Sequence, residues 1–475
     1  MTIQADFKTA LHEALQLWHK DPALGSPLAD LMLVQRELAT RGGNLRRATN
    51  QALLTALQTL AADHPSEAAL LRARFLDGKT AFIVANERGV AEITLFKQQQ
   101  RALGLLAETL WDLEQHAVTD RLATVLKRLP PATYDAVVGI EAYIQQVSAV
   151  LLTPAAPWLI AIEGLGGIGK TTLAHQLVAR LARGAGPFAD FGWVSAQQQI
   201  LQPGESIKQV ARPALTAAAL VEALGSQLLA SDAAPMPAAV EHALTALETR
   251  LRQTPHLIVV DNLETLADVE SLLPTLSRLA NPSKFLLTAR ESFHGPAAIY
   301  HFAVPELAEP DALALVRQEA RLHGLAHVAS AEDDELRPLF ETVGGNPLAL
   351  RLVTGQLHLL SLAQVVENLQ EARGRKAEDL YHYVYWQAWR RLPVEVQDTL
   401  MLMPLFAQDG ADLAAVRRVS DLCDEDLLDA LEYLAKLSLV NVGGDLHGRR
   451  YSIHRLTESF LLKEVIKWRG EGRLA

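Results

Sequence analysis

The first 130 residues carry apolar side chains at intervals of three and four, the spacing of one buried helix face. The pattern is clearest in LADLMLVQRELA, ATNQALLTALQTLA, SEAALLRARFL and TLFKQQQRALGLLAETLWDLEQ. We therefore predict an all-helical N-terminal domain over residues 1–130. The segment RLPPATYD (128–135) follows, and its two adjacent prolines are typical of a linker.

From residue 131 onward, short apolar runs alternate with helical stretches. The runs are WLIAI (158–162), FGWVSA (191–196), HLIVVD (256–261), KFLLTA (284–289) and IYHFAV (299–304). Continuous apolar runs are typical of parallel strands that are buried on both faces. Because helices separate them, the pattern predicts an α/β domain with a parallel sheet over residues 131–304.

The last 170 residues return to helical spacing. Residues 305–391 predict a helical domain. Residues 392–475 predict three helices, then a strand pair from LSLVNVGG and RRYSIH, then a final helix from RLTESFLLKEVIKW. Helices followed by a two-stranded ribbon indicate a winged-helix domain.

Composition narrows the class of protein. The chain has 475 residues, a net charge of −11 and 49% hydrophobic residues, which suits several packed domains and argues against a generally basic nucleic-acid binder. The first 130 residues are nearly neutral, so a nucleic-acid contact is expected there if anywhere. Cys423 is the single cysteine, and neither a signal-peptide pattern nor an apolar run of membrane-spanning length occurs. We therefore expect a cytoplasmic protein.

A glycine-rich stretch directly after the first apolar run predicts a phosphate-binding loop. It matches the pattern G-x-x-x-x-G-K-[ST]. Glycines let backbone amides approach phosphate oxygens, and the helix that follows adds its positive N-terminal end. Lys170 is expected to reach the β- and γ-phosphates, and Thr171 a magnesium ion. The predicted nucleotide contacts of this loop are Gly164, Gly166, Gly167, Ile168, Gly169, Lys170, Thr171 and Thr172.

Two further run ends carry candidate catalytic residues. Asp261 ends HLIVVD and is expected to hold magnesium through water beside the phosphates. Asn262 cannot act as a base, whereas Glu264 could orient the attacking water, so slow hydrolysis is expected. Arg290 ends SKFLLTAR, where an arginine can sense the γ-phosphate through charge-assisted hydrogen bonds.

The motifs together form an ordered series. VVGIEAYIQQV (137–147) is followed by GLGGIGKTTLA, FGWVSA, LIVVDNLE, FLLTAR, VGGNPLALRLV (343–353) and YSIHRL (451–456). This series resembles the NB-ARC branch of the STAND signalling ATPases, which includes apoptotic-protease activators, plant disease-resistance proteins and bacterial regulators. The resemblance covers residues 137–468 and implies a P-loop NTPase core followed by a helical domain and a winged helix.

The resemblance also implies roles for particular residues. Val138 and Gly139 would pack near adenine, Pro347 would lie against the nucleotide, and His454 would touch the β-phosphate of ADP. The chain departs from the family at two positions. Ile140 stands where an arginine is common, and Arg455 replaces the aspartate that usually follows the histidine.

Such a family membership would make the protein an ATP/ADP-controlled signalling switch and a slow ATPase. ADP would hold a closed resting state, and exchange for ATP would permit self-association, in the regulation of transcription or of a bacterial defence or stress response. Two alternatives stay open. One is a continuously hydrolysing motor or transposition-type ATPase, and the other is a DNA-binding regulator in which the nucleotide is structural.

The N-terminal domain contains a segment similar to the helix-turn-helix of sigma factors, at about residues 70–116. Ala85, Gly89 and Leu95 stand at the crossing, the turn and the seat of its second helix. The outer side of that helix offers side chains that can contact phosphates and bases. They are Thr94, Lys97, Gln98 and Arg101. DNA binding is one interpretation, and protein contacts through the same packing are the other.

The partner that receives or sends the signal is not evident in the sequence. Family members usually carry a repeat-built sensor after the winged helix, whereas this sequence ends at Ala475. We expect either sensing through the N-terminal domain or a sensor or effector protein supplied in trans.

Overall fold

The computed structural model divides the chain into two compact units. One comprises residues 1–128, 178–192 and 249–257, and the other contains the rest. The described residues are 2–20, 25–41, 44–132, 137–184, 186–196, 215–229, 239–263, 266–290, 298–371, 385–386, 388–406, 410–445 and 448–466. Over these ranges, no helix combines the length and apolar character needed to cross a membrane.

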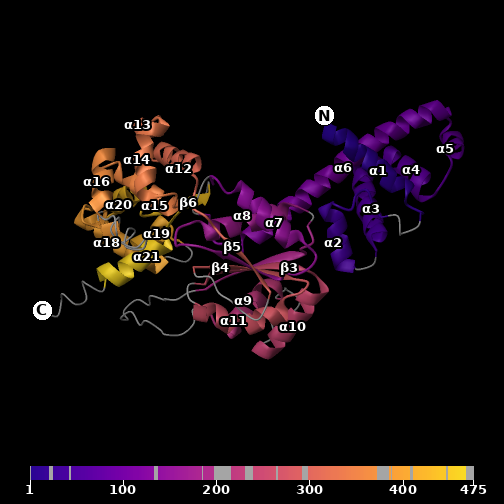
Figure 1. Cartoon of the computed structure of the whole chain (residues 1–475). Helices are drawn as coiled ribbons and strands as arrows, with labels where there is room; N and C mark the ends of the chain where they lie inside the picture. The colour runs from indigo at the N-terminus through magenta and orange to yellow at the C-terminus, as the bar shows by residue number, and fades with distance from the viewer. Residues whose placement is uncertain are drawn as a thin grey trace. The chain divides into compact units, whose positions relative to one another are not determined.

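The N-terminal segment is built from helices, as the three-and-four spacing predicts (Figure 1). They are α1 (Thr2–Gln16), α2 (Met32–Arg41), α3 (Leu45–Asp63), α4 (Pro65–Leu71), the π-helical turn η2 (Arg72–Leu76), α5 (Ala81–Arg88) and α6 (Glu92–Leu126). Gly89 ends α5 with φ 65°, a left-handed conformation that favours glycine. The next helix therefore begins after a short turn, as the helix-turn-helix interpretation requires.

Helix α6 is longer than its strongest apolar pattern, which stops at Gln115. It continues to Leu126, and the added turns bury Ala117 and Val125. The residue just after its C-terminal end, Arg128, is bonded to the start of β2, in the same compact unit. The Arg128 guanidinium donates to Asp190 Oδ1 at 2.9 Å and to the Phe191 carbonyl at 2.6 Å. These contacts, which link residues far apart in sequence, explain why the helix extends beyond the pattern.

The five apolar runs form one five-stranded sheet, as predicted. The strands are β1 (Leu159–Glu163), β2 (Asp190–Ser195), β3 (His256–Leu263), β4 (Lys284–Ala289) and β5 (Ile299–Ala303), in the order β2-β3-β4-β1-β5. β1 lies parallel to both of its neighbours, with Leu159 opposite Phe285 and Ile299. This places the end of β1, where the glycine loop begins, inside the sheet.

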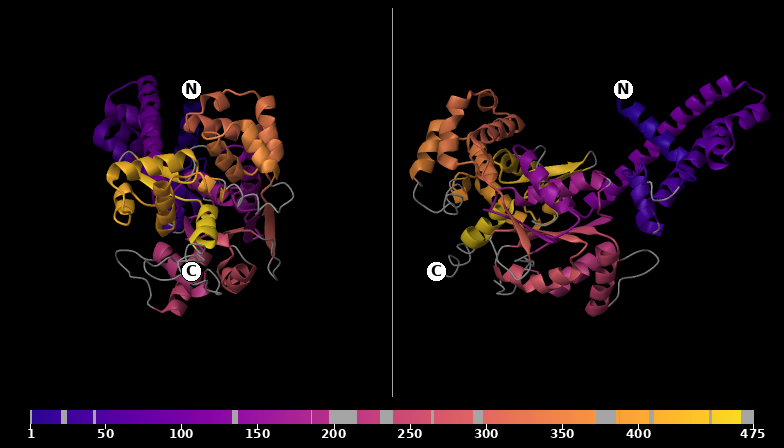
Figure 2. Two further views of the ribbon diagram at one scale, coloured as in Figure 1. Left: turned by 90° about the vertical axis from the view of Figure 1, so that its left-hand side faces the viewer. Right: turned by 45° about the vertical axis from the view of Figure 1, so that its right-hand side comes forward.

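Helices cover both faces of this sheet, which gives the three-layered α/β fold predicted from the sequence. α7 (Glu141–Leu152) and α8 (Lys170–Arg183) lie on one face (Figures 1 and 2). α9 (Ala217–Leu228), α10 (Val240–Gln253) and α11 (Leu266–Leu279) lie on the other. β1, β3 and β4 are almost entirely buried between these layers.

Of the predicted helical domain at 305–391, residues 309–371 hold helices, and residues 372–384 and 387 lie outside the described residues. The elements are α12 (Glu309–Leu322), α13 (Ala326–Ala329), α14 (Asp333–Val343), α15 (Pro347–Gln356) and α16 (Leu362–Glu371). Then come α18 (Val394–Leu402), η3 (Met403–Phe406), α19 (Leu413–Arg417), α20 (Asp424–Lys436), the antiparallel pair β6 (Asn441–Asp445) and β7 (Gly448–Ser452), α21 (Arg455–Phe460) and η4 (Leu461–Ile466). This is the order of elements that a winged helix requires.

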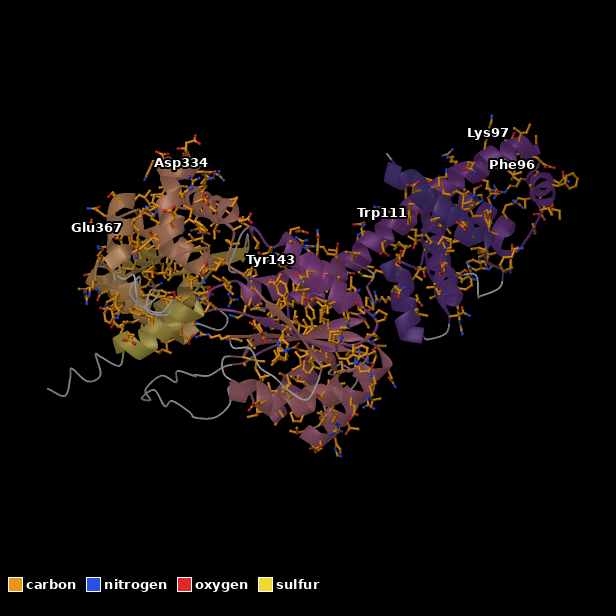
Figure 3. All side chains as sticks on the ribbon, in the orientation of Figure 1. Phe96, Lys97, Trp111, Tyr143, Asp334 and Glu367 are labelled. Atoms are coloured by element: carbon orange, nitrogen blue, oxygen red, sulfur yellow. The ribbon has the colours of Figure 1, made fainter. Side chains whose placement is uncertain are left out.

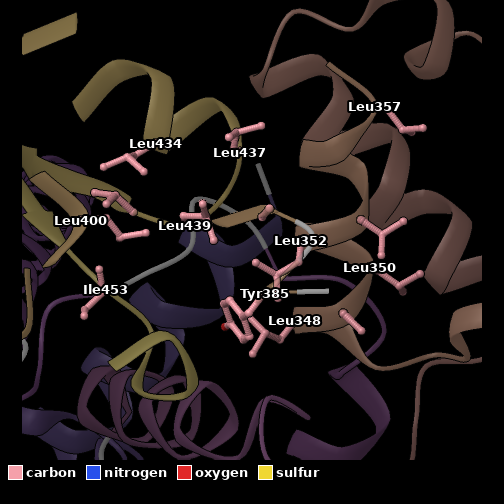
Figure 4. Packing of buried hydrophobic residues seen from close by; sticks show 14 of the residues in the cluster. Leu348, Leu350, Leu352, Leu357, Tyr385, Leu400, Leu434, Leu437, Leu439 and Ile453 are labelled. Atoms are coloured by element: carbon pink, nitrogen blue, oxygen red, sulfur yellow. The ribbon is translucent and has the colours of Figure 1, made fainter. Parts of the chain in front are cut away.

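One continuous apolar cluster joins these two helical regions. Leu348, Leu350 and Leu352 of α15 belong to the same cluster as Leu434 of α20 and Ile453 (Figure 4). Tyr385 is fully buried there, and its hydroxyl lies 3.0 Å from Thr457 Oγ1. Burial raises the pKa of Tyr385, so its hydroxyl stays protonated. The predicted helical domain and winged helix thus share a core.

α15 and the turn after α20 approach each other closely in this core. A Cβ atom added at Gly355 would lie 2.5 Å from the Leu437 carbonyl oxygen, a backbone atom that cannot move aside alone. Glycine therefore sets the distance between the two elements.

We predict that Gly355→Ala destabilises the fold by about 1–3 kcal/mol, because the added methyl group overpacks this contact. The measurement is the free energy of unfolding in urea. Gly184→Ala is the matched control, since a Cβ there would meet only the Leu181 carbonyl at 3.9 Å. Equal effects of the two substitutions would contradict the prediction.

Candidate functional site

The glycine loop adopts a backbone that side-chain-bearing residues rarely take. The φ angles are 146° at Gly164, 74° at Gly167 and 98° at Gly169. These values lie in the left-handed region that favours glycine. The loop leads into α8, whose N-terminal amides begin at Lys170. The local structure thus has the form that binds phosphate at a helix N-terminus.

Lys170 lies back over this loop. Its Nζ donates to the Gly164 carbonyl at 2.7 Å and to the Leu165 carbonyl at 2.8 Å. Both acceptors are at the start of the loop, so the ammonium group is held beside the loop backbone. This is the position from which a lysine can reach phosphate oxygens.

Asp261 and Thr171 come together as the sequence predicts, although 90 residues separate them. Thr171 Oγ1 donates to Asp261 Oδ1 at 2.9 Å. Asp261 is 5% exposed, within the buried strand β3. Hydroxyl and carboxylate oxygens are ligands that Mg²⁺ prefers. The pair therefore fits a magnesium ion held by α8 on one side and β3 on the other.

Thr288 is a member of this site that the sequence did not suggest. Its Oγ1 donates to Asp261 Oδ1 at 2.5 Å and accepts from the Asn262 amide at 2.8 Å. Asn262 has φ 75°, a conformation rare for a residue with a side chain. The buried Thr288 hydroxyl, on β4, thus orients the carboxylate and fixes the backbone that follows it.

Asn346 is a second unforeseen member, and it joins the loop to α15. Its Nδ2 donates to the Gly166 carbonyl at 3.2 Å, while its Oδ1 accepts from the amides of Leu348 and Ala349. The side chain is 2% exposed. Asparagine before proline is a helix N-cap signal, which could have indicated the cap but not its contact with the loop.

The loop and α15 also interlock sterically. A Cβ added at Gly167 would lie 2.7 Å from Leu348 Cβ, and the Leu348 amide lies 3.4 Å from the Gly167 carbonyl. Pro347, predicted to lie against the nucleotide, stands between Asn346 and Leu348 at the start of α15. The structure therefore brings the Pro347 segment to the phosphate loop.

Glu163 directly precedes the loop, and its buried carboxylate contacts an exposed histidine. Its Oε1 lies 2.6 Å from His301 Nδ1 on β5, and the Glu163 side chain is 8% exposed. The pair ties the end of β1 to its neighbouring strand just before the chain turns into the loop. Sequence pattern alone gave no signal for it, because Glu163 and His301 are 138 residues apart.

Three further residues of the predicted site lie at the start of α7 and at the end of β4. Val138 and Gly139 precede α7, and a Cβ at Gly139 would lie 2.9 Å from Asp311 Oδ2 of α12. The Arg290 amide donates to the Leu263 carbonyl at 3.2 Å, at the end of β4.

The winged-helix motif is described only in part. His454 directly precedes α21, and its carbonyl accepts from the Glu458 amide at 3.0 Å. Glu264 lies outside the described residues, and so does the side chain of Arg455. Their predicted roles stay predictions.

Comparison with known proteins identifies the region around this loop. The family model described as NB-ARC domain matches residues 140–318. The regulatory protein AfsR of Streptomyces coelicolor is 26% identical over 396 residues, which cover 80% of this chain and 37% of AfsR. A putative disease resistance protein of Arabidopsis thaliana is 25% identical over 256 residues, 51% of this chain and 21% of that protein. The chain thus spans well under half the length of both.

Solved structures resemble this chain more distantly. One is a signal transduction ATPase with numerous domains (STAND) from Pyrococcus horikoshii that has a tetratricopeptide repeat sensor. Its TM-score is 0.43 at 17% identity, with 70% of this chain and 43% of that chain covered. Another is Cdc6p from Pyrobaculum aerophilum, with a TM-score of 0.32 at 13% identity, covering 70% of this chain and 97% of that one.

We predict that Thr288→Val weakens the magnesium-dependent part of nucleotide affinity about 10-fold, because Asp261 loses the hydrogen bond that orients it. The measurement is nucleotide binding by calorimetry with magnesium and with a chelator. Thr288→Ser keeps the hydroxyl and should bind like the wild type. If the Val variant loses equal affinity in both conditions, Thr288 does not act through the metal site.

Proposed function

We propose that this chain, whose residues 140–318 match the NB-ARC domain model, is an ATP/ADP-controlled signalling switch. In this proposal, ADP and Mg²⁺ occupy the loop in a closed resting state, and exchange for ATP permits self-association. The observation that carries it is the contact of Asn346 with the Gly166 carbonyl. Through this contact the N-terminus of α15 is bonded directly to the loop backbone that would hold the phosphates.

Each residue of the candidate site has a defined role in this proposal. Lys170 neutralises phosphate charge, and the loop amides donate to phosphate oxygens. Thr171 and Asp261 hold the metal ion, with Asp261 oriented by Thr288. Bound magnesium would screen the charge between phosphates. The residues around the loop thus bind and position the nucleotide.

Hydrolysis is proposed to be slow. Asn262 follows Asp261 and has no carboxylate with which to orient water, and its amide side chain instead donates to the Ala196 carbonyl at 3.4 Å. Glu264 is the proposed general base and Arg290 the proposed γ-phosphate sensor. Slow turnover suits a switch, since the ATP-bound state must persist long enough to signal.

The names of two similar proteins suggest which process this chain regulates. AfsR is a regulatory protein, and the Arabidopsis relative is a putative disease resistance protein. We propose that this chain regulates transcription or a bacterial defence or stress response. A continuously hydrolysing ATPase is the alternative, and steady turnover without bound ADP after purification would favour it.

We predict that Lys170→Ala lowers the affinity for both ATP and ADP at least about 100-fold, because the phosphates lose their counter-charge. Nucleotide content after purification, measured by chromatography of the denatured protein, checks this. Lys20→Ala, at an exposed lysine, is the control. A Lys170→Ala protein that retains one nucleotide per chain would refute the phosphate-loop assignment.

We also predict that His454→Ala releases ADP roughly 10- to 100-fold faster, since a hydrogen bond to a charged group is worth about 1.5–3 kcal/mol. Release of a fluorescent ADP analogue measures the rate. The control is His327→Ala, at an exposed histidine of α13. Because Arg455 could compensate, His454→Ala/Arg455→Ala is measured alongside. Unchanged ADP release in both variants would show that the winged helix does not hold the bound ADP.

A further inference from the structure

The outer face of α6 carries four charges in a symmetric order. The buried face of the helix includes Leu95, Leu103, Leu106 and Leu110. Lys97, Arg101, Glu108 and Asp112 are exposed on the opposite face. Among the described residues, none of these four side chains forms an ion pair. We call these four residues the α6 stripe.

The stripe reverses its sign about the midpoint between Gly104 and Leu105. Lys97 lies seven residues before Gly104, and Asp112 lies seven after Leu105. Arg101 and Glu108 each lie three residues from the same pair. A helix with this order is complementary to its own antiparallel copy, because every cation then faces an anion.

We propose that a second copy of this chain docks on the α6 stripe, with the two α6 helices antiparallel across a two-fold axis near Gly104. Lys97 then faces Asp112 of the partner subunit, and Arg101 faces Glu108 of the partner subunit. A Cβ added at Gly104 would meet Lys8 Nζ at 3.8 Å, so the Lys8 side chain of each copy lies beside the crossing point. The contact is isologous, which limits it to a dimer.

Apolar side chains beside the stripe supply surface to bury. Ile93 is 74% exposed, Phe96 48% and Trp111 42%. Figure 3 shows Phe96 and Trp111 on α6. Helix α1 bounds the stripe on one side, since Lys8 Nζ donates to the Gln100 carbonyl at 2.8 Å and Phe7 packs edge-on against Trp111. Apolar burial then contributes affinity, while the charge pairs set register and orientation.

The same features disfavour DNA as the occupant. Glu108 and Asp112 extend the face that would approach a phosphate backbone, and they would repel it. The exposed Ile93 and Phe96 offer no donor to phosphate. Gln98, one of the four predicted DNA contacts, is only partly exposed. A protein surface of opposite charge order fits this face better.

The experiment uses two double variants of the full chain. Lys97→Glu/Arg101→Glu makes the stripe wholly acidic, and Glu108→Lys/Asp112→Lys makes it wholly basic. Each should raise the dimer dissociation constant roughly 100-fold, because like charges then face each other. An equimolar mixture of the two should form a heterodimer. Sedimentation velocity measures the masses.

The matched control is Glu425→Lys/Asp429→Lys on α20, which reverses two exposed acids at the same spacing. It should dimerise like the wild type. Lys170→Ala should also dimerise, so loss of the nucleotide switch and loss of this contact give different results. A monomeric wild type, variants that dimerise unchanged, or a mixture that stays monomeric overturns the proposal. So would a basic variant that gains duplex-DNA affinity with no change of mass.

Discussion

The buried amide of Asn346 is the contact on which the nucleotide site depends. One side of the amide caps α15, and the other side holds the Gly166 carbonyl of the phosphate loop. At 2% exposure, leaving either the Nδ2 or the Oδ1 of Asn346 without a hydrogen bond would lower the stability of the fold. Moving α15 therefore disturbs the loop, and reshaping the loop disturbs the cap. Gly167, which has no room for a side chain beside Leu348, reinforces the same coupling.

The coupling continues from α15 into the C-terminal elements. α15 packs at Gly355 against the turn after α20, and both belong to one apolar cluster. A packed core changes between discrete arrangements rather than bending gradually. A change in the glycine loop would thus reach α20 and the elements after it through one short helix. This is the physical basis on which a bound nucleotide could select between two states.

The sequence predicted the sheet well, because parallel strands buried on both faces appear as continuous apolar runs. The glycine loop and the Thr171–Asp261 pair followed from spacing and from the chemistry of magnesium. Asn346 and Thr288 were missed, since their partners lie 180 and 27 residues away and a single sequence carries no distances. The full length of α6 was missed for the same reason, as Arg128 anchors its last turn to Asp190.

The length of α6 has a consequence for how the N-terminal unit could work. Residues 97–112 of the helix carry the symmetric charges, and Arg121, nearer its C-terminal end, is bonded to residues 188–191 of the same unit. Arg121 donates to the Phe188 carbonyl and lies 5.2 Å from the Phe191 ring centroid. Burial lowers the pKa of Arg121, while Asp190 opposes that shift, so the guanidinium stays charged and bonded. A second copy bound along α6 would therefore act on an element that is bonded, through Arg121, to the start of β2 and the residues just before it.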